Sequence, residues 1–224
     1  MDHSVEQDSN PTAPSDRKVA PVLNVARLDW IERAIAASLY IVFTIRIYGD
    51  YRQTGHAGNL LVLALEFMVV FFILIRRPAT AVSVRPTDWV FALTATCLPL
   101  MVAPSAGGPI GPPALGSALL LLGLFAQLAA KLALNRNFGL VAARRKLIMH
   151  GPYRFVRHPI YLSYFIGHVG FFLLNPTLWN FAVYALCAGF QVARVLAEER
   201  VLSSDPAYCA YCEKVRYRLV PGVF

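Results

Sequence analysis

The stretch "GPYRFVRHPIYLSYF", residues 151–165, places ionisable side chains directly before an apolar, aromatic run. Arg154, Arg157 and His158 occupy its polar part, and Pro159 follows them at a position where proline favours the start of a helix. The question is why three such groups stand at the mouth of a segment apolar enough to enter a membrane. One answer is structural: the arginines could anchor the segment at a membrane surface.

A second cluster, "ARVLAEERVL", offers the other answer. Arg194 and Glu198 are four residues apart and therefore share one helix face. They could form a simple ion pair. Together with the first cluster they could also form a site with cations for a carboxylate and a glutamate for a ribose or an ammonium group. Tyr153, Tyr161 and Tyr164 would then wall a planar ligand.

The composition predicts a membrane protein. Of the 224 residues, 57% are hydrophobic and only 15% are charged, whereas a soluble domain carries about 25% charged residues. The mean hydropathy is +0.51. The net charge of +8 could suggest a nucleic-acid partner, but basic residues beside apolar helices are typical of the cytoplasmic side of membrane proteins. We therefore expect no nucleic acid.

Apolar runs predict an all-α polytopic membrane bundle of about five to six transmembrane helices. The runs cover about 30–48, 60–75, 89–103, 114–134, 160–174 and 178–193, and the last two form a helical hairpin around Asn175–Pro176. Basic residues lie before the first run and after the second and fourth. The positive-inside rule then places both termini in the cytoplasm of what we expect to be a bacterial inner membrane.

The same pattern divides the chain into three parts. Residues 1–28 are expected to be a disordered cytoplasmic N-terminus, and residues 29–134 to hold transmembrane helices one to four. Residues 135–224 would form a cytoplasmic cofactor-binding region with the hairpin and a C-terminal cap. Cys209 and Cys212 form a C-x-x-C without a second pair, so we expect reduced thiols and no metal site.

From residue 134 to the end, the chain resembles the integral-membrane isoprenylcysteine carboxyl methyltransferase family and the wider group that includes phospholipid methyltransferases. The resemblance is carried by "GPYRFVRHPIYLSYF" with its Arg-His-Pro motif, by the "R-x-x-x-E-E" helix and by "Y-x-x-Y…R-L-V-P-G-V-F". The spacer between Glu199 and Tyr208 is shorter than in relatives. Whether it preserves the family geometry is open.

The resemblance implies a membrane methyltransferase that uses S-adenosyl-L-methionine and no metal. It implies that the methyl acceptor is met by Arg194, supported by Arg157, both in a catalytic role. The implied cofactor contacts are Arg145, Lys146, Leu147, Ile148, Tyr153, His158, Pro159, Ile160, Tyr161, Glu198 and Glu199. The acceptor would be a lipophilic or lipidated substrate reached from the bilayer, among membrane lipids.

The resemblance implies a carboxylate acceptor, such as a prenylated-cysteine-like C-terminus, and the chemistry of the residues fits it. A carboxylate is already ionised near pH 7, so the enzyme would need no general base. An amine, as in phospholipid methylation, would first have to lose a proton, which Glu199 or His158 could accept. A sterol-reductase-like enzyme that uses NADPH is a further alternative, because its tail is similar. The sequence decides neither the acceptor, nor the oligomeric state, nor a role for Glu66 in the second apolar run.

Overall fold

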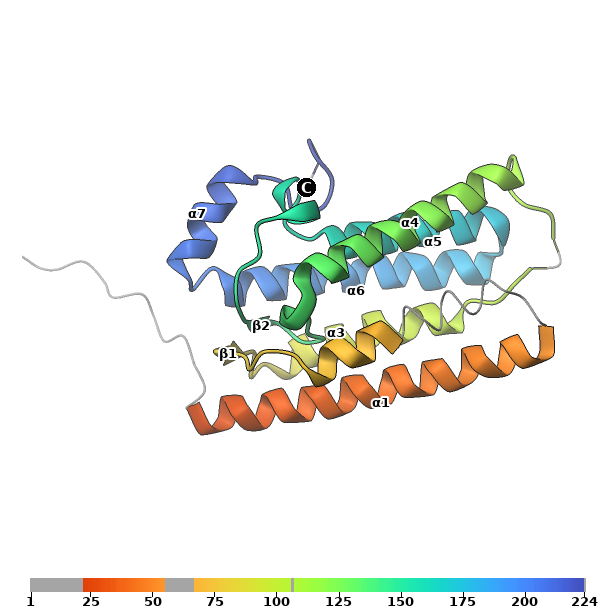
Figure 1. The fold of residues 1–224 in the computed structure, drawn as a ribbon. Helices are drawn as coiled ribbons and strands as arrows, with labels where there is room; N and C mark the ends of the chain where they lie inside the picture. Colours follow the sequence, from red (N-terminus) through yellow and green to blue (C-terminus); the bar gives the residue numbers. More distant parts are fainter. Residues whose placement is uncertain (1–21, 55–66, 106, 224) are drawn as a thin grey trace, which may run out of the picture.

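The computed structural model describes residues 22–54 and 67–223, apart from residue 106. Long helices lie side by side along a common direction, and a small β-ribbon and a short C-terminal helix lie at one end of them (Figure 1). The elements are α1 (Val22–Thr54), a helical segment at 67–74, β1 (Ala81–Val82), α3 (Pro86–Cys97), α4 (Pro113–Leu134), β2 (Ala143–Arg144), α5 (Pro159–Leu174), α6 (Leu178–Leu202) and α7 (Pro206–Lys214). Short 3₁₀ turns cover Leu98–Met101, Asn135–Asn137 and Gly151–Arg154.

The prediction of a mainly helical fold is confirmed. Within the described ranges, two helices are long and apolar enough to cross a membrane: Pro113–Asn137, which includes α4, and α6. The apolar helix α5 is shorter, at 16 residues. Five to six crossings and a cytoplasmic location of the termini stay predictions. Glu66 and the first part of the second apolar run, up to residue 66, lie outside the described residues.

The distribution of side chains is that of a protein whose helices face lipid. Large apolar side chains are exposed on α1, α4 and α6, among them Trp30, Ile41, Val42, Leu121, Phe125, Phe181 and Leu186. Charged and polar side chains are buried instead, among them Asp29, Glu32, Arg76, Asp88, Lys131, Asn180, Gln191 and Arg194. A soluble monomer rarely exposes so much contiguous apolar surface, whereas a bilayer would cover it.

Three helix boundaries differ from the sequence prediction. The helix α1 begins at Val22, inside the segment predicted to be disordered up to residue 28, because no proline or glycine interrupts the chain after Pro21. The helix α6 continues to Leu202, beyond the apolar run that ends near residue 193. The short helix α7 was not predicted. Its first turn is fixed by Pro206 and by the side chain of Asp205, which accepts a hydrogen bond from the Ala207 N–H at 2.9 Å.

Small residues bring α4 and α5 into backbone contact. A Cβ atom added at Gly170 would lie 2.6 Å from the backbone nitrogen of Leu120 and 2.8 Å from the carbonyl oxygen of Gly116. A Cβ atom added at Gly123 would lie 2.7 Å from the backbone nitrogen of Gly167. Such contacts are typical of membrane helices, in which small residues let backbones approach closely. They hold α5, and with it the His158–Pro159 turn, against the end of α4.

We expect Gly170→Ala to destabilise the protein by about 1–3 kcal/mol, because the new methyl group can be accommodated only if two backbones separate. Gly189→Ala on α6 is the matched control, since nothing lies within 4 Å of its Cβ position. Alanine there gains helix propensity of about 1 kcal/mol. Thermal unfolding in detergent would measure both variants. Equal midpoints for the two would contradict the close packing of α4 and α5.

Candidate functional site

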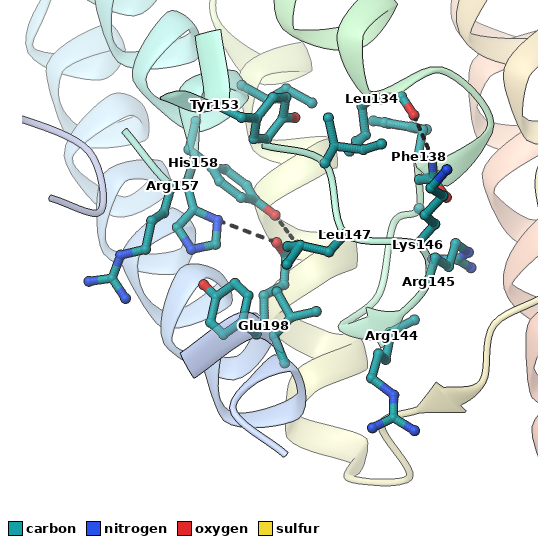
Figure 2. A pocket seen from close by; sticks show the side chains of 18 of the residues that line it. Leu134, Phe138, Arg144, Arg145, Lys146, Leu147, Tyr153, Arg157, His158 and Glu198 are labelled. Atoms are coloured by element: carbon teal, nitrogen blue, oxygen red, sulfur yellow. Dashed lines mark hydrogen bonds and ion pairs between the residues drawn. The ribbon is translucent and has the colours of Figure 1, made fainter. Parts of the chain in front are cut away.

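The main cavity lies where α4 and α6 end, and Leu134 and Leu202 at these two helix ends both line it. Its walls come from the segment 137–148, the 3₁₀ turn Gly151–Arg154, the start of α5, the last turns of α6, and α7. Figure 2 shows Tyr153, His158, Leu147 and Glu198 around this space. The polar turn and the "EE" helix, 40 residues apart in the chain, are therefore brought to one site, as their residue types predicted.

Glu199 holds the polar turn in place from behind the cavity. Its carboxylate contacts the Arg157 guanidinium at 2.9 Å, the His158 Nε2 at 3.2 Å and the Arg218 Nε at 2.7 Å, and it accepts a hydrogen bond from the Tyr208 hydroxyl at 3.2 Å. The backbone N–H groups of Arg157 and His158 donate to carbonyls of the C-terminal tail at 3.0 and 2.9 Å. The tail therefore closes the turn, which gives the predicted C-terminal cap a physical role.

Glu198 faces the cavity and connects three side chains. It accepts a hydrogen bond from the Tyr161 hydroxyl, lies 3.7 Å from His158 Nδ1, and lies 3.6 Å from the Nε of Arg194. Arg194 is 6% exposed, its guanidinium stands 5.1 Å from the Tyr161 ring centre, and its Nη2 donates to the Gly139 carbonyl at 3.4 Å. Its buried Nε has no hydrogen-bond partner among the described residues. A buried cation with an unused donor is suited to an anionic ligand group.

Arg145 is directed away from the cavity floor. Its Nη2 contacts Asp29 at 2.8 Å and Glu32 at 3.1 Å, both on α1. Glu32 also accepts hydrogen bonds from the backbone N–H groups of Leu140 and, at 3.1 Å, Val141. This buried set ties the segment 139–145, which forms one cavity wall, to α1. The resemblance to the methyltransferase family begins at residue 134 and gives the first helix no motif. Its acidic pair, Asp29 and Glu32, was therefore not predicted as part of the site.

Nine of the eleven predicted cofactor contacts line the cavity, and so do Arg157 and Arg194. The two that do not are Pro159 and Glu199. Tyr164, which was expected to wall a planar ligand, also lines the cavity. Further lining residues that were not predicted include Leu134, Phe138, Leu202, Tyr208 and Tyr211. The Tyr208–Tyr211 pair had a sequence signal, because a Y-x-x-Y spacing places both rings on one face of a short helix.

The tyrosines at the mouth are neutral hydrogen-bond donors near pH 7. Burial, above all, raises the pKa of Tyr153 well above its usual range and raises the pKa of Tyr211 to about 12. The Tyr211 hydroxyl donates to the Tyr153 carbonyl at 2.5 Å, which joins α7 to the 3₁₀ turn. Burial opposes the charge of Arg157, but Glu199 and Cys212 outweigh it and raise the pKa of this guanidinium, which stays cationic.

The side chains that line the cavity match the chemical groups of S-adenosyl-L-methionine. Tyrosine rings can face a sulfonium or an adenine, because aromatic faces attract cations and stack on planar rings. Glu198 offers an acceptor for an ammonium or a ribose, and the Arg194 guanidinium offers charge for a carboxylate. Apolar residues at the helix ends, such as Leu134 and Leu202, would keep water from the reacting groups.

One comparison with known proteins gives a family match, and it covers part of the chain. Residues 113–205 match the family model described as phospholipid methyltransferase. A search of curated proteins finds no significant match. A solved structure of a eukaryotic intramembrane Ras methyltransferase, an isoprenylcysteine carboxyl methyltransferase, is similar at 20% identity and a TM-score of 0.49. The match covers 80% of this chain and 68% of that chain, and at this distance it carries no argument about function.

The matched segment holds α4, α5 and α6, and with them the polar turn, Arg194 and Glu198. It stops before α7, which forms the outer wall of the cavity. The resemblance to the integral-membrane methyltransferases that the sequence motifs indicated is thus confirmed, through the phospholipid methyltransferase family, for residues 113–205.

Proposed function

We propose that this protein is a membrane methyltransferase that transfers a methyl group from S-adenosyl-L-methionine to a lipophilic carboxylate, such as the C-terminus of a prenylated-cysteine-like substrate. The observation that carries the proposal is Arg194. Its buried guanidinium lines the same cavity as Glu198 and His158 and keeps one donor without a hydrogen-bond partner among the described residues. The family match over residues 113–205 supports the reaction class.

S-adenosyl-L-methionine, when bound, supplies an electrophilic methyl group on a sulfonium. The chain's own task is to hold the acceptor within about 3–3.5 Å of that group and to exclude water. Arg194 would bind the acceptor carboxylate through its Nε, which lies 3.6 Å from Glu198 and makes no hydrogen bond among the described residues, and would orient one oxygen for in-line attack. Glu198, fixed by the Tyr161 hydroxyl, would bind the donor's ammonium or ribose. His158, Tyr153 and the backbone of residues 145–148 would complete the donor site.

An amine acceptor is the second candidate, and the description of the matched family as phospholipid methyltransferase favours it. The amine would have to lose a proton before or during attack. The sequence predicted that Glu199 or His158 could accept this proton. Glu199 does not line the cavity and is held by Arg157, His158 and Arg218. His158 and Glu198 both face the cavity and would be the proton acceptors instead.

The product distinguishes the two candidates. With tritium in the donor methyl group, we expect a farnesyl-cysteine acceptor to gain label that alkali releases as volatile methanol, because a methyl ester hydrolyses and an N-methyl group does not. Phosphatidylethanolamine under the same conditions should gain none. Alkali-stable label in the lipid would contradict the carboxylate and support the amine.

Donor binding tests the proposal without an acceptor. Calorimetry in detergent should detect S-adenosyl-L-methionine binding to the wild type and its loss in Glu198→Ala and His158→Ala, with NADPH as the control ligand. Glu213→Ala on α7, which removes an exposed carboxylate outside the cavity, is the matched control. No binding to folded wild type would overturn the proposal, and binding of NADPH instead would move it to a reductase.

A further inference from the structure

A second, open hollow lies on the outer side of the segment that walls the main cavity. It is lined by Arg77, Pro78, Thr80, residues 144–146 and Asp205. Figure 2 shows the side chains of Arg144, Arg145 and Lys146 on the side of this segment away from His158 and Glu198. Leu147 lines the main cavity alone, whereas the three basic residues line both the main cavity and the second hollow.

The β-ribbon fixes the positions of these basic groups. The backbone N–H of Thr80 donates to the Arg144 carbonyl at 2.8 Å, and the Arg144 Nε donates to the Thr80 hydroxyl at 3.0 Å. The Arg77 N–H donates to the Arg136 carbonyl at 2.7 Å, and the Arg77 carbonyl accepts from the Arg145 Nε at 3.3 Å. The cations thus stand on a hydrogen-bonded frame, so little ordering would be needed to bind an anion.

The hollow carries an excess of positive charge. Four of its lining residues are cationic and one, Asp205, is anionic. The Arg145 charge is used by Asp29 and Glu32. In the part of the chain that the structure describes, Arg77, Arg144 and Lys146 make no ion pair. The hollow therefore holds three cations without an ion pair among the described residues, and two of them are guanidinium groups, which can bind a phosphate with two parallel hydrogen bonds.

The position of the hollow in the fold indicates which kind of molecule would carry that phosphate. Asp205 lies three residues after the end of α6, one of the two helices within the described ranges that are long and apolar enough to span a membrane. It lines both the hollow and the main cavity. The ends of spanning helices lie at the level of the lipid headgroups. We propose that this hollow binds the phosphate of an anionic phospholipid. Because the same segment walls the main cavity, the bound lipid would also stabilise that wall.

Native mass spectrometry of protein released from mixed phosphatidylglycerol and phosphatidylcholine nanodiscs tests the site. We expect wild type to retain one phosphatidylglycerol, and Arg77→Gln/Lys146→Gln to bind it about thirtyfold more weakly, since each interfacial cation contributes about fivefold. The control pair Arg85→Gln/Lys214→Gln removes one exposed arginine and one exposed lysine outside the hollow. It should retain the lipid as wild type does.

Three results would overturn the proposal: equal retention in the two double variants, equal retention of phosphatidylcholine by wild type, or displacement of the lipid by millimolar inorganic phosphate. The last result would assign the site to free phosphate. Circular dichroism of each variant would show whether a loss of binding comes from a loss of fold. Lipid retention needs no methyl transfer, so the proposed reaction and the lipid site can fail separately.

Discussion

Replacing Arg194 by glutamine is expected to lower methyl transfer to a carboxylate acceptor by about 100-fold or more, while donor binding stays close to that of wild type. The guanidinium is buried and lines the cavity beside Glu198. Without it, an acceptor carboxylate loses the cation proposed to bind it directly, and misplacement of a reacting group by about 1 Å can cost about 100-fold. Initial rates and donor affinity, measured separately, check the prediction.

The variant Arg194→Lys separates charge from geometry. Lysine keeps the charge but lacks the planar fork, so we expect it to restore only part of the rate. Arg216→Gln removes an exposed arginine from the C-terminal tail and should leave the rate unchanged. For an amine acceptor the expected effect of Arg194→Gln is the opposite, because a neighbouring cation disfavours binding of the ammonium form. A rate that rises in Arg194→Gln would therefore contradict the carboxylate and favour phospholipid methylation.

The sequence allowed the inner half of the site to be predicted, because its residues lie in short motifs with fixed geometry. Arg194 and Glu198 share a helix face by their spacing, and the His158–Pro159 turn begins α5. Such local patterns give the side chains that face the cavity. They do not show which of Glu198 and Glu199 faces the cavity. The two are neighbours in one helix, so their side chains point about 100° apart. Only the packing of the C-terminal tail shows that Glu199 faces away from the cavity.

The parts that were not predicted depend on contacts between distant segments. The β-ribbon joins Ala81 to Arg144, 63 positions later in the chain, through strands of only two residues, too short to leave a pattern of alternating polarity. Asp29 and Glu32 lie where the first apolar run begins, and the sequence shows the cost of burying their charge but not the distant partners that offset it. Those partners are Arg76 and Arg145, and the resemblance had assigned Arg145 to the cofactor.

Loss of the Glu32 side chain is expected to have the largest effect on stability. Its carboxylate is fully buried, lies 2.9 Å from Arg76 and 3.1 Å from Arg145, and accepts two backbone N–H groups from the segment 139–145. Glu32→Ala would leave two buried guanidinium groups with one carboxylate fewer and two N–H groups without an acceptor. Breaking a buried ion pair costs about 3–5 kcal/mol. Thermal unfolding in detergent would measure the loss.

The variant Glu32→Gln distinguishes the two roles of this side chain. Its amide oxygen can still accept from Leu140 and Val141, but its charge no longer offsets Arg76 and Arg145. If the hydrogen bonds to the segment position the cavity wall, Glu32→Gln should unfold at a lower temperature than wild type yet keep a KM for S-adenosyl-L-methionine near the wild-type value. Glu32→Ala should raise that KM even at temperatures at which it is folded.

The substitution Arg145→Gln completes this test of positioning. Arg145→Gln removes the guanidinium but leaves Glu32 with Arg76, so a KM close to that of wild type would mean that Arg145 does not contact the cofactor. A strong rise in KM in Arg145→Gln without a change in the unfolding temperature would mean the reverse, and would restore the role that the family resemblance implies. The geometry favours the first result, because the Arg145 Nη2 is occupied by Asp29 and Glu32 on α1. The helix that carries no recognisable motif would then be the one that fixes the cofactor wall.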